Sequence, residues 1–353
     1  MAVTVMLAWG IRGQHGHERG AAFVGAAAGL ALAAATGVER WVWAALWGSL
    51  GFAVGGAVGY GWLVGATLHG STPALVGLIS AGALWGALGG GALGWGYRVG
   101  RPRERLFMAA LIGVAWGCLD GPLSMQGGAL RRVIALTAFA GLVCALLGYY
   151  VGYRREAGIR RLVLAGAVGW GVGFPLGARW LAWGPALGWS VDWWKWMEHT
   201  IGLTGGLALA WGVLRAPWPT PAPLAPWQRW CSCWWFFVGL PAWLWANNFV
   251  YWWHERRIIT GVTVGVLAVV CWVFVVGAYL VGASRVRTGV GFQRPWSPAA
   301  LRGLCLGFVW LGTATAVAKT WLPQPWGPTQ TVFVGCAVAL TGLLTVKPSM
   351  EFR

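Results

Sequence analysis

Long uncharged apolar runs limit the possible folds of this chain more than any other feature of its sequence. Runs of 18 or more residues recur along the whole chain, and each is long enough to cross the roughly 30 Å hydrocarbon layer of a bilayer as a helix. Only helices and closed barrels satisfy their backbone hydrogen bonds in lipid, and these runs lack the alternation typical of barrel strands. The sequence therefore predicts an all-α fold, a polytopic transmembrane helical bundle.

Composition supports this class and allows the spans to be counted. Hydrophobic residues make up 58% of the 353 residues and charged residues only 10%, whereas a soluble domain usually carries about 25% charged residues. We expect about eleven spans, at 20–36, 42–66, 74–97, 106–124, 133–152, 162–183, 198–214, 230–253, 258–282, 301–318 and 328–346.

Glycine content divides the chain into two parts. Glycine supplies 44 of the first 215 residues and 13 of the last 138, and the segment APWPTPAPLAP (216–226) holds five prolines between them. Such a proline-rich segment favours an extended connector. We therefore expect a glycine-rich bundle of about seven spans at 1–215, a linker at 216–229, and a bundle of about four spans rich in Trp, Val and Leu at 230–353.

Several glycines recur every fourth residue and predict close helix packing. The series are Gly51, Gly55 and Gly59; Gly82, Gly86, Gly90 and Gly94; and Gly169, Gly173 and Gly177. This spacing removes side chains from one face of a helix and lets neighbouring backbones approach. The alternative interpretation is that these smooth faces slide during alternating access.

The net charge of +17 predicts membrane topology rather than nucleic-acid binding. Of the 26 basic residues 23 are arginines, scattered through short loops without an extended basic tract, so we expect lipid headgroups and no nucleic acid as their partner. Alternate loops, with the C-terminal tail, hold 17 basic residues on one side and 9 on the other. The positive-inside rule then places the C-terminus in the cytoplasm. Whether the protein binds a cofactor is unknown from the sequence.

This topology places the ionisable candidates together on the outer side. All five histidines and five of the nine acidic residues fall there. An acid at membrane depth is costly and functional by default, which singles out Asp120; the alternative is a surface pair with Arg131 or Arg132. The full set of candidates for a substrate or proton site is Arg12, His15, His17, Glu18, Asp120, Gln126, Asp192, His199, Asn247, Asn248, His254 and Glu255.

Two segments carry most of these candidates. WGIRGQHGHERGAA (9–22) follows an apolar segment too short to cross, which predicts a re-entrant or interfacial element. Its charges suit anion binding, a proton relay or half of a metal site. His17, His199 and His254 are candidate metal ligands, but the signal is weak because they lack the i, i+4 histidine spacing of a helical metal site. WSVDWWKWMEH (189–199) predicts a helix lying flat in the outer interface, as an anchor or as a wall for a flat ligand.

The first of these segments resembles a known motif. WGIRGQHGHERGA (9–21) is similar to a stretch of uncharacterised bacterial multi-span membrane proteins, in which Trp-Gly-Ile-Arg-Gly precedes Gly-His-Glu and a Gly-Ala-rich span. The match covers about a dozen residues. The resemblance implies a bacterial inner-membrane location and singles out Arg12, His17 and Glu18, but no established activity attaches to that group.

Three function classes follow from these features. The leading hypothesis is a transporter of a small solute, in which Glu18 and Asp120 exchange protons or bind a cation and Arg12 holds an anionic group. The second is a membrane-embedded enzyme that acts on a lipid-linked substrate with His and Glu groups. The third is a structural subunit that contacts other membrane subunits through its Trp-rich surfaces.

Overall fold

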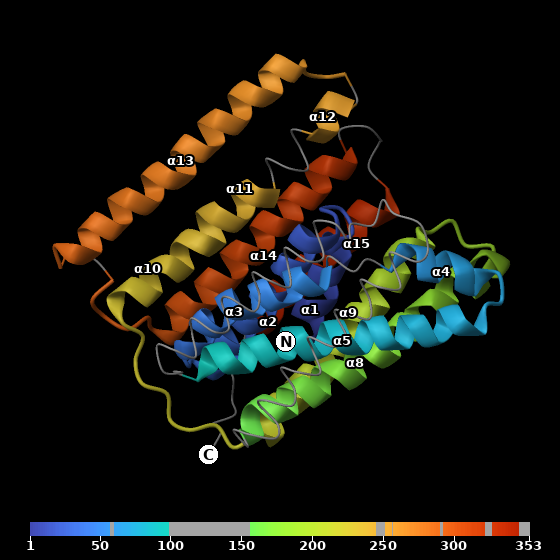
Figure 1. The fold of residues 1–353 in the computed structure, drawn as a ribbon, viewed down its shortest axis with the longest axis horizontal. Helices are drawn as coiled ribbons and strands as arrows, with labels where there is room; N and C mark the ends of the chain where they lie inside the picture. Colours follow the sequence, from blue (N-terminus) through green and yellow to red (C-terminus); the bar gives the residue numbers. More distant parts are fainter. Residues whose placement is uncertain are drawn as a thin grey trace.

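A computed structural model describes residues 1–56, 60–98, 156–244, 251–255, 257–289, 292–321 and 327–345 of the chain. In these ranges all regular structure is helical (Figure 1). The elements are α1 (Ala2–Arg12), α2 (His17–Thr36), α3 (Arg40–Gly56), α4 (Gly61–Leu68), α5 (Thr72–Tyr97), α8 (Ala157–Trp183), the 3-10 turn η2 (Gly184–Leu187), α9 (Trp193–Arg215), α10 (Pro226–Trp234), the π-helical turn η3 (Trp235–Gly239), α11 (Leu240–Leu244), α12 (Tyr251–Glu255), α13 (Gly261–Arg287), α14 (Pro298–Trp321) and α15 (Pro328–Thr345).

The helices fit an integral membrane protein, but eleven spans are not supported. Six helices in the described ranges are long and apolar enough to cross a bilayer, or up to seven if α3 and α4, bent by 50°, form one broken span. Two predicted spans, 106–124 and 133–152, lie outside the described residues. The predicted span 198–214 lies within α9, which is not among the six. The predicted span 230–253 overlaps the continuous helical run formed by α10, η3 and α11 (226–244) and the short helix α12.

The glycine-rich helices form a layered series in which each helix packs on the next. The pairs α2–α3, α3–α5, α5–α8 and α8–α9 share the most extensive contacts. A methyl group added at Gly86 would overlap the backbone carbonyl of Gly166, and one added at Gly90 would overlap that of Leu162. The glycine faces of α3, α5 and α8 therefore serve close packing, as the recurrence of glycine at every fourth residue predicts.

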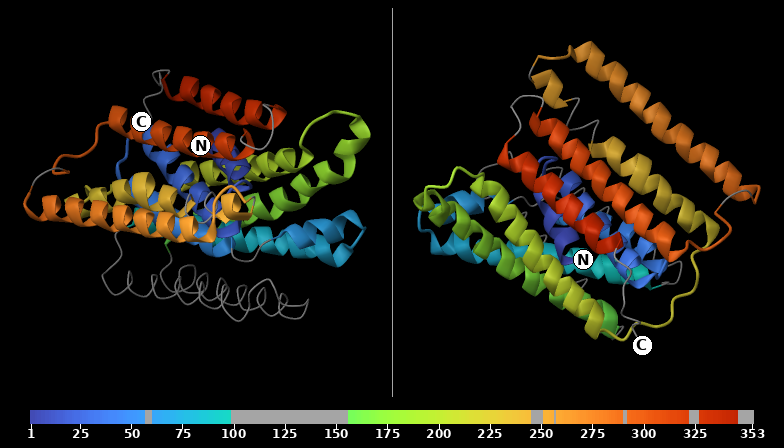
Figure 2. Two further views of the ribbon diagram at one scale, coloured as in Figure 1. Left: turned by 90° about the horizontal axis from the view of Figure 1, so that it is seen from above. Right: turned by 180° about the vertical axis from the view of Figure 1, so that it is seen from behind.

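Helix α1 lies inside the bundle. It packs on α9 and α2, with α14 and α15 also in contact (Figures 1 and 2). Leu7, Trp9 and Ile11 are completely buried, and Gly202 of α9 lies against Val5 and Trp9. Residues 1–9 thus form a short helix covered by protein rather than lipid, which is the condition under which a segment too short to cross is tolerated.

The prediction of a flat interfacial helix at 189–199 is wrong. Asp192 caps α9, its carboxylate accepting N–H groups of Trp194 and Lys195, and the helix then continues without interruption to Arg215. The segment is therefore the start of a long bundle helix. The indoles still gather there, with Trp180 and Trp193 stacked at 6.1 Å and Trp189 stacked on Trp193 at the same distance.

The residues that join the two predicted parts of the chain are extended only up to Ala225. Residues 217–225 have no helix, and α10 begins at Pro226 inside the segment predicted as linker. Arg229 of α10 is buried and makes a bidentate ion pair with Glu39 of the α2–α3 connection. Arg229 also donates to the carbonyl oxygens of Phe292 and Gln293. This pair ties together segments that are remote in sequence.

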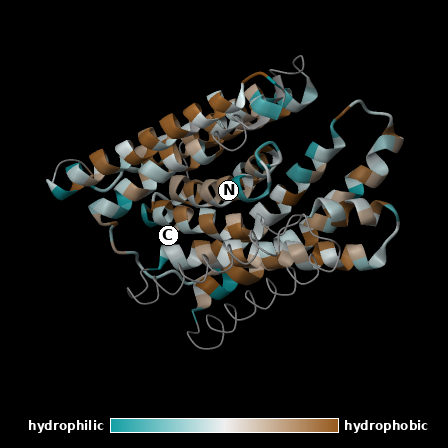
Figure 3. Cartoon of the chain, turned by 45° about the horizontal axis from the view of Figure 1, so that its top comes forward, coloured by the Kyte–Doolittle hydropathy of each residue, from teal (hydrophilic) through white to brown (hydrophobic). Residues whose placement is uncertain are grey.

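Charged side chains divide between the two ends of the bundle. Contacts of Arg40 with the Tyr97 carbonyl, and of Arg229 with Glu39 and the carbonyls of residues 292–293, gather the connections after α2, α5, α9 and α13 at one end of the bundle. Hydrophobic residues dominate the long helices, while hydrophilic ones gather at helix ends and near the N-terminus (Figure 3).

Candidate functional site

The candidate site lies where α1 ends and α2 begins. Residues 13–16 connect the two helices, and Gly16 has a φ of 83°, a left-handed conformation that favours glycine. Arg12 ends α1 and is only 3% exposed. A charge this deeply buried is costly unless it is paired and hydrogen-bonded. The contacts of Arg12 therefore define the site.

Aromatic rings surround the Arg12 guanidinium. Its central carbon lies 5.0, 4.9 and 4.8 Å from the ring centres of Trp9, Tyr60 and Trp85, and its Nη1 donates to the Tyr60 hydroxyl at 3.0 Å. Cation–π contacts of this kind are stronger in desolvated sites, where each contributes about 2 kcal/mol. The rings fix the guanidinium in one position while leaving its charge unneutralised.

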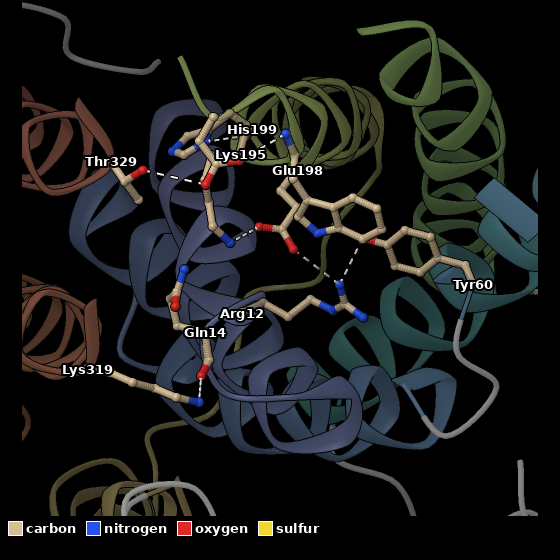
Figure 4. Close-up of polar contacts among 10 residues, drawn as sticks. Arg12, Gln14, Tyr60, Lys195, Glu198, His199, Lys319 and Thr329 are labelled. Carbon is tan, nitrogen blue, oxygen red and sulfur yellow. Dashed lines mark hydrogen bonds and ion pairs between the residues drawn. The ribbon is translucent and has the colours of Figure 1, made fainter. Parts of the chain in front are cut away.

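Glu198 of α9 supplies the opposite charge and is shared by two cations. Its Oε1 lies 3.9 Å from Arg12 Nη1, and its Oε2 accepts a short hydrogen bond from Lys195 Nζ one turn earlier (Figure 4). Glu198 is 1% exposed and Lys195 is 6% exposed. A methyl group added at Gly13 would overlap the Glu198 carboxylate. We call Arg12, Lys195 and Glu198 the charged cluster.

The bend between α3 and α4 also lies beside the charged cluster. Tyr60, whose hydroxyl contacts Arg12, immediately precedes α4, at the 50° bend between α3 and α4. Gly56, the last residue of α3, lies against the backbone of His17 and Glu18. Two helix interruptions therefore meet at this point: the α1–α2 connection and the α3–α4 bend.

Three of the histidine candidates surround the charged cluster. Arg12 Nη2 lies 3.3 Å from His17 Nδ1. His199 Nδ1 donates to the Lys195 carbonyl oxygen at 2.7 Å, and the buried His199 Nε2 has no hydrogen-bond partner among the described residues. His15 Nε2 lies 3.3 Å from Thr315 Oγ1 of α14. Burial, with Lys319 and Lys195 nearby, lowers the pKa of His15 to about 3, so this imidazole is neutral at physiological pH.

Other candidates lie at the edge of the site or outside the described residues. Glu18 is partly buried at the start of α2, and Asp192 is exposed at the start of α9. His254 and Glu255 are exposed on α12, and Glu255 lies near Lys319 of α14, whose ammonium donates to the Gln14 carbonyl. Four candidates fall on residues outside the described ranges: Asp120, Gln126, Asn247 and Asn248.

The metal candidates do not converge. Within the described ranges, no three His, Cys, Asp or Glu side chains come close enough together to hold a metal ion. His17 and His199 both lie beside the charged cluster, but each has a basic neighbour: Arg12 for His17 and the Lys195 ammonium for His199. This arrangement suits an anionic ligand better than a metal cation.

Lys195, Glu198 and Tyr60 are not among the site residues that the sequence predicts. Lys195 and Glu198 were assigned to a flat surface helix, and Tyr60 lies inside an apolar run. The available signal was the i, i+3 spacing of an opposite-charge pair within a Trp-rich segment, because such a spacing places both groups on one face of a helix.

A groove runs beside the charged cluster between α9 and α15, with α1 at its base. Its volume is about 280 Å³, and Lys195 and His199 line it together with Asp192 and Thr329 at one end. Most of the remaining wall is apolar: Met6, Val191, Trp196, Pro328, Val332 and Cys336. Lys195 therefore both lines the groove and belongs to the charged cluster.

Comparisons with protein-family models, with curated proteins and with solved structures give no match to this chain.

Proposed function

We propose that this chain is a secondary transporter of a small organic anion in the bacterial inner membrane, with the charged cluster as its substrate site and the arginine-rich end in the cytoplasm. The observation that carries the proposal is the meeting of two helix interruptions at a buried ionisable cluster. Secondary transporters commonly place substrate and coupling-ion sites at discontinuous helices near the middle of the protein. The charge distribution supports the orientation through the positive-inside rule.

The balance of buried charge favours an anionic substrate. Arg12 and Lys195 carry two positive charges and Glu198 one negative charge, so the charged cluster has a formal charge of +1. A net buried charge is unfavourable in a low-dielectric site. A carboxylate bound at Arg12 and Lys195 would neutralise that excess, and Glu198 would hold the two cations in place when the site is empty.

Substitution of Glu198 tests the proposal in proteoliposomes. We expect Glu198→Gln to lower the uptake of radiolabelled carboxylates by about tenfold or more, because it removes charge-assisted bonds that position both Arg12 and Lys195. The measurement is the initial uptake rate for a panel of lactate, benzoate and decanoate.

Glu156→Gln is the matched control, because Glu156 pairs with Arg98 at the start of α8 and has no contact with the charged cluster among the described residues. Its uptake should stay within about twofold of the original protein. Equal rates in Glu198→Gln and the original protein, or an equal loss in both variants, would remove the charged cluster from the transport mechanism.

A membrane-embedded enzyme acting on a lipid-linked substrate is the second candidate, and the groove beside Lys195 favours it. Release of a headgroup from lipid extracts by the purified protein, without uptake of any solute, would support this class.

A further inference from the structure

The last turns of α8 carry an arginine that lies apart from the charged cluster. Arg179 is exposed one turn before Trp183, the last residue of α8, and its guanidinium carbon lies 5.5 Å from the Trp183 ring centre. Within the described ranges no carboxylate pairs with Arg179. Because α8 begins beside Arg98, at the end of the bundle where the arginine-rich connections gather, Arg179 lies near the opposite end.

A pocket of about 190 Å³ lies beside Arg179, between α8 and the turn that joins α4 to α5 (Figure 1). Three hydroxyl side chains line it: Thr67, Ser71 and Thr72. The Ser71 oxygen accepts the N–H of Ala74, which leaves the Ser71 proton available to donate, and Thr72 is exposed. The other lining residues are uncharged: Leu68, Gly70, Leu75, Pro175, Ala178 and Ala182. The pocket therefore offers one positive charge and hydroxyl donors, and none of its lining residues is acidic.

An exposed apolar stripe of α8 leads to Arg179. Leu164, Val168, Val172 and Leu176 recur every fourth residue along one side of the helix and are 48–63% exposed. No charged residue lies between Leu164 and Arg179. At 1.5 Å per residue this segment is about 22 Å long, more than the roughly 15 Å of hydrocarbon in one leaflet. The stripe can therefore cover an acyl chain while Arg179 lies at the level of the lipid headgroups.

We propose that this end of α8 binds an anionic glycerophospholipid of the phosphatidylglycerol type, with its phosphodiester at Arg179 and its acyl chains along the stripe. Arginine suits this role because its planar guanidinium can donate two parallel N–H bonds to a phosphate. The hydroxyls of Ser71 and Thr72 supply further donors. This surface lies apart from the charged cluster, and the proposal does not depend on which solute the protein transports.

The charge and the size of the pocket both restrict the lipid. A zwitterionic phosphatidylethanolamine would bring an ammonium group to a pocket without an acidic lining residue, whereas phosphatidylglycerol brings only hydroxyls beside its phosphate. The volume of about 190 Å³ is below the roughly 300–1,000 Å³ of pockets that enclose a whole ligand. The pocket therefore suits a headgroup whose acyl chains remain outside, on the exposed stripe.

Native mass spectrometry of the full-length protein, released from detergent micelles with added dioleoylphosphatidylglycerol, measures the affinity of each bound lipid. We expect Arg179→Gln to weaken the tightest phosphatidylglycerol binding by about fivefold or more, the contribution of one basic residue close to anionic lipid. Arg285→Gln is the matched control, because Arg285 is exposed on α13 and does not line the pocket. It removes the same charge and should leave the tightest binding within about twofold of the original protein.

Competing compounds separate the headgroup from its alternatives. Dioleoylphosphatidylethanolamine should bind the original protein more weakly than phosphatidylglycerol, and this difference should shrink in Arg179→Gln. Glycerol 3-phosphate and inorganic phosphate carry the anion without acyl chains, so neither should displace phosphatidylglycerol even in large molar excess. Displacement by either would overturn the proposal in favour of a site for a free anion.

Three further results would also overturn the proposal. They are unchanged phosphatidylglycerol binding in Arg179→Gln, an equal loss in Arg285→Gln, and equal affinity of the original protein for the two lipids. If Arg179→Gln fails to fold, Thr72→Val removes a hydroxyl donor from an exposed position without changing the charge. It should weaken phosphatidylglycerol binding while leaving that of phosphatidylethanolamine unchanged, and identical binding of both lipids to Thr72→Val and the original protein would contradict the assignment.

Discussion

Replacing Arg229 by methionine is expected to lower the free energy of unfolding by about 3–5 kcal/mol, because it leaves the buried Glu39 carboxylate without its bidentate partner. Arg229 is 2% exposed, and its loss also leaves the carbonyl oxygens of Phe292 and Gln293 without this donor. The measurement is reversible unfolding in mixed detergent micelles, followed by tryptophan fluorescence.

An exposed ion pair at the same end of the bundle provides the control. Arg98 pairs with Glu156, but its side chain is 49% exposed, and exposed pairs contribute about 0–1 kcal/mol. Arg98→Met should therefore change stability by less than about 1 kcal/mol.

A double variant separates the lost pair from the buried charge that remains. Glu39→Leu combined with Arg229→Met removes both charges, and replacing a buried pair with apolar residues is often neutral. The double variant should therefore be more stable than Arg229→Met alone. A double variant as unstable as the single one would show that the contacts of Arg229 with α10 and residues 292–293, rather than the ion pair, hold this region together.

The second large effect is expected at the contact between α5 and α8. A methyl group at Gly86 would overlap the Gly166 carbonyl, and one at Gly166 would overlap the Gly86 carbonyl. Overpacking costs about 1–3 kcal/mol where neighbours adjust, and backbone atoms adjust less easily than side chains. Gly86→Ala should therefore destabilise by about 3 kcal/mol in the same unfolding measurement.

Gly335 of α15 is the matched control, because an added methyl group there has no neighbour within 4 Å. Gly335→Ala should be neutral or stabilising by up to about 1 kcal/mol, the gain in helix propensity. A Gly86→Ala protein as stable as the original would mean that α5 and α8 separate at little cost, which would favour sliding glycine faces over rigid packing.

Much of the helical framework could be predicted because it follows from local properties. The runs predicted at 20–36 and 74–97 correspond to α2, His17–Thr36, and α5, Thr72–Tyr97. Apolar length sets these limits, since a span must cover the hydrocarbon layer. The number of spans was less predictable, because α9 starts with charged residues, and the run predicted at 230–253 begins in α10 and contains the π-helical turn η3.

The candidate site was predictable only in part. The stretch around Arg12 and His17 was selected because charge beside an apolar run is unusual. Glu198 and Tyr60 were not selected, since each becomes significant only through its contact with Arg12, and Tyr60 is 48 residues away along the chain. Local spacing carries no information about such a contact.

The sequence by itself determined the helical membrane class of the protein and the approximate limits of most described helices. These depend on hydropathy, which is summed along the chain. Only the tertiary structure decided that Glu198 lies between Arg12 and Lys195 and that Lys195 also lines a groove. Those contacts arise because the glycine faces let helices pack closely enough for charged groups of different helices to meet. The distance between two helices depends on the packing of the whole bundle rather than on any local stretch of sequence.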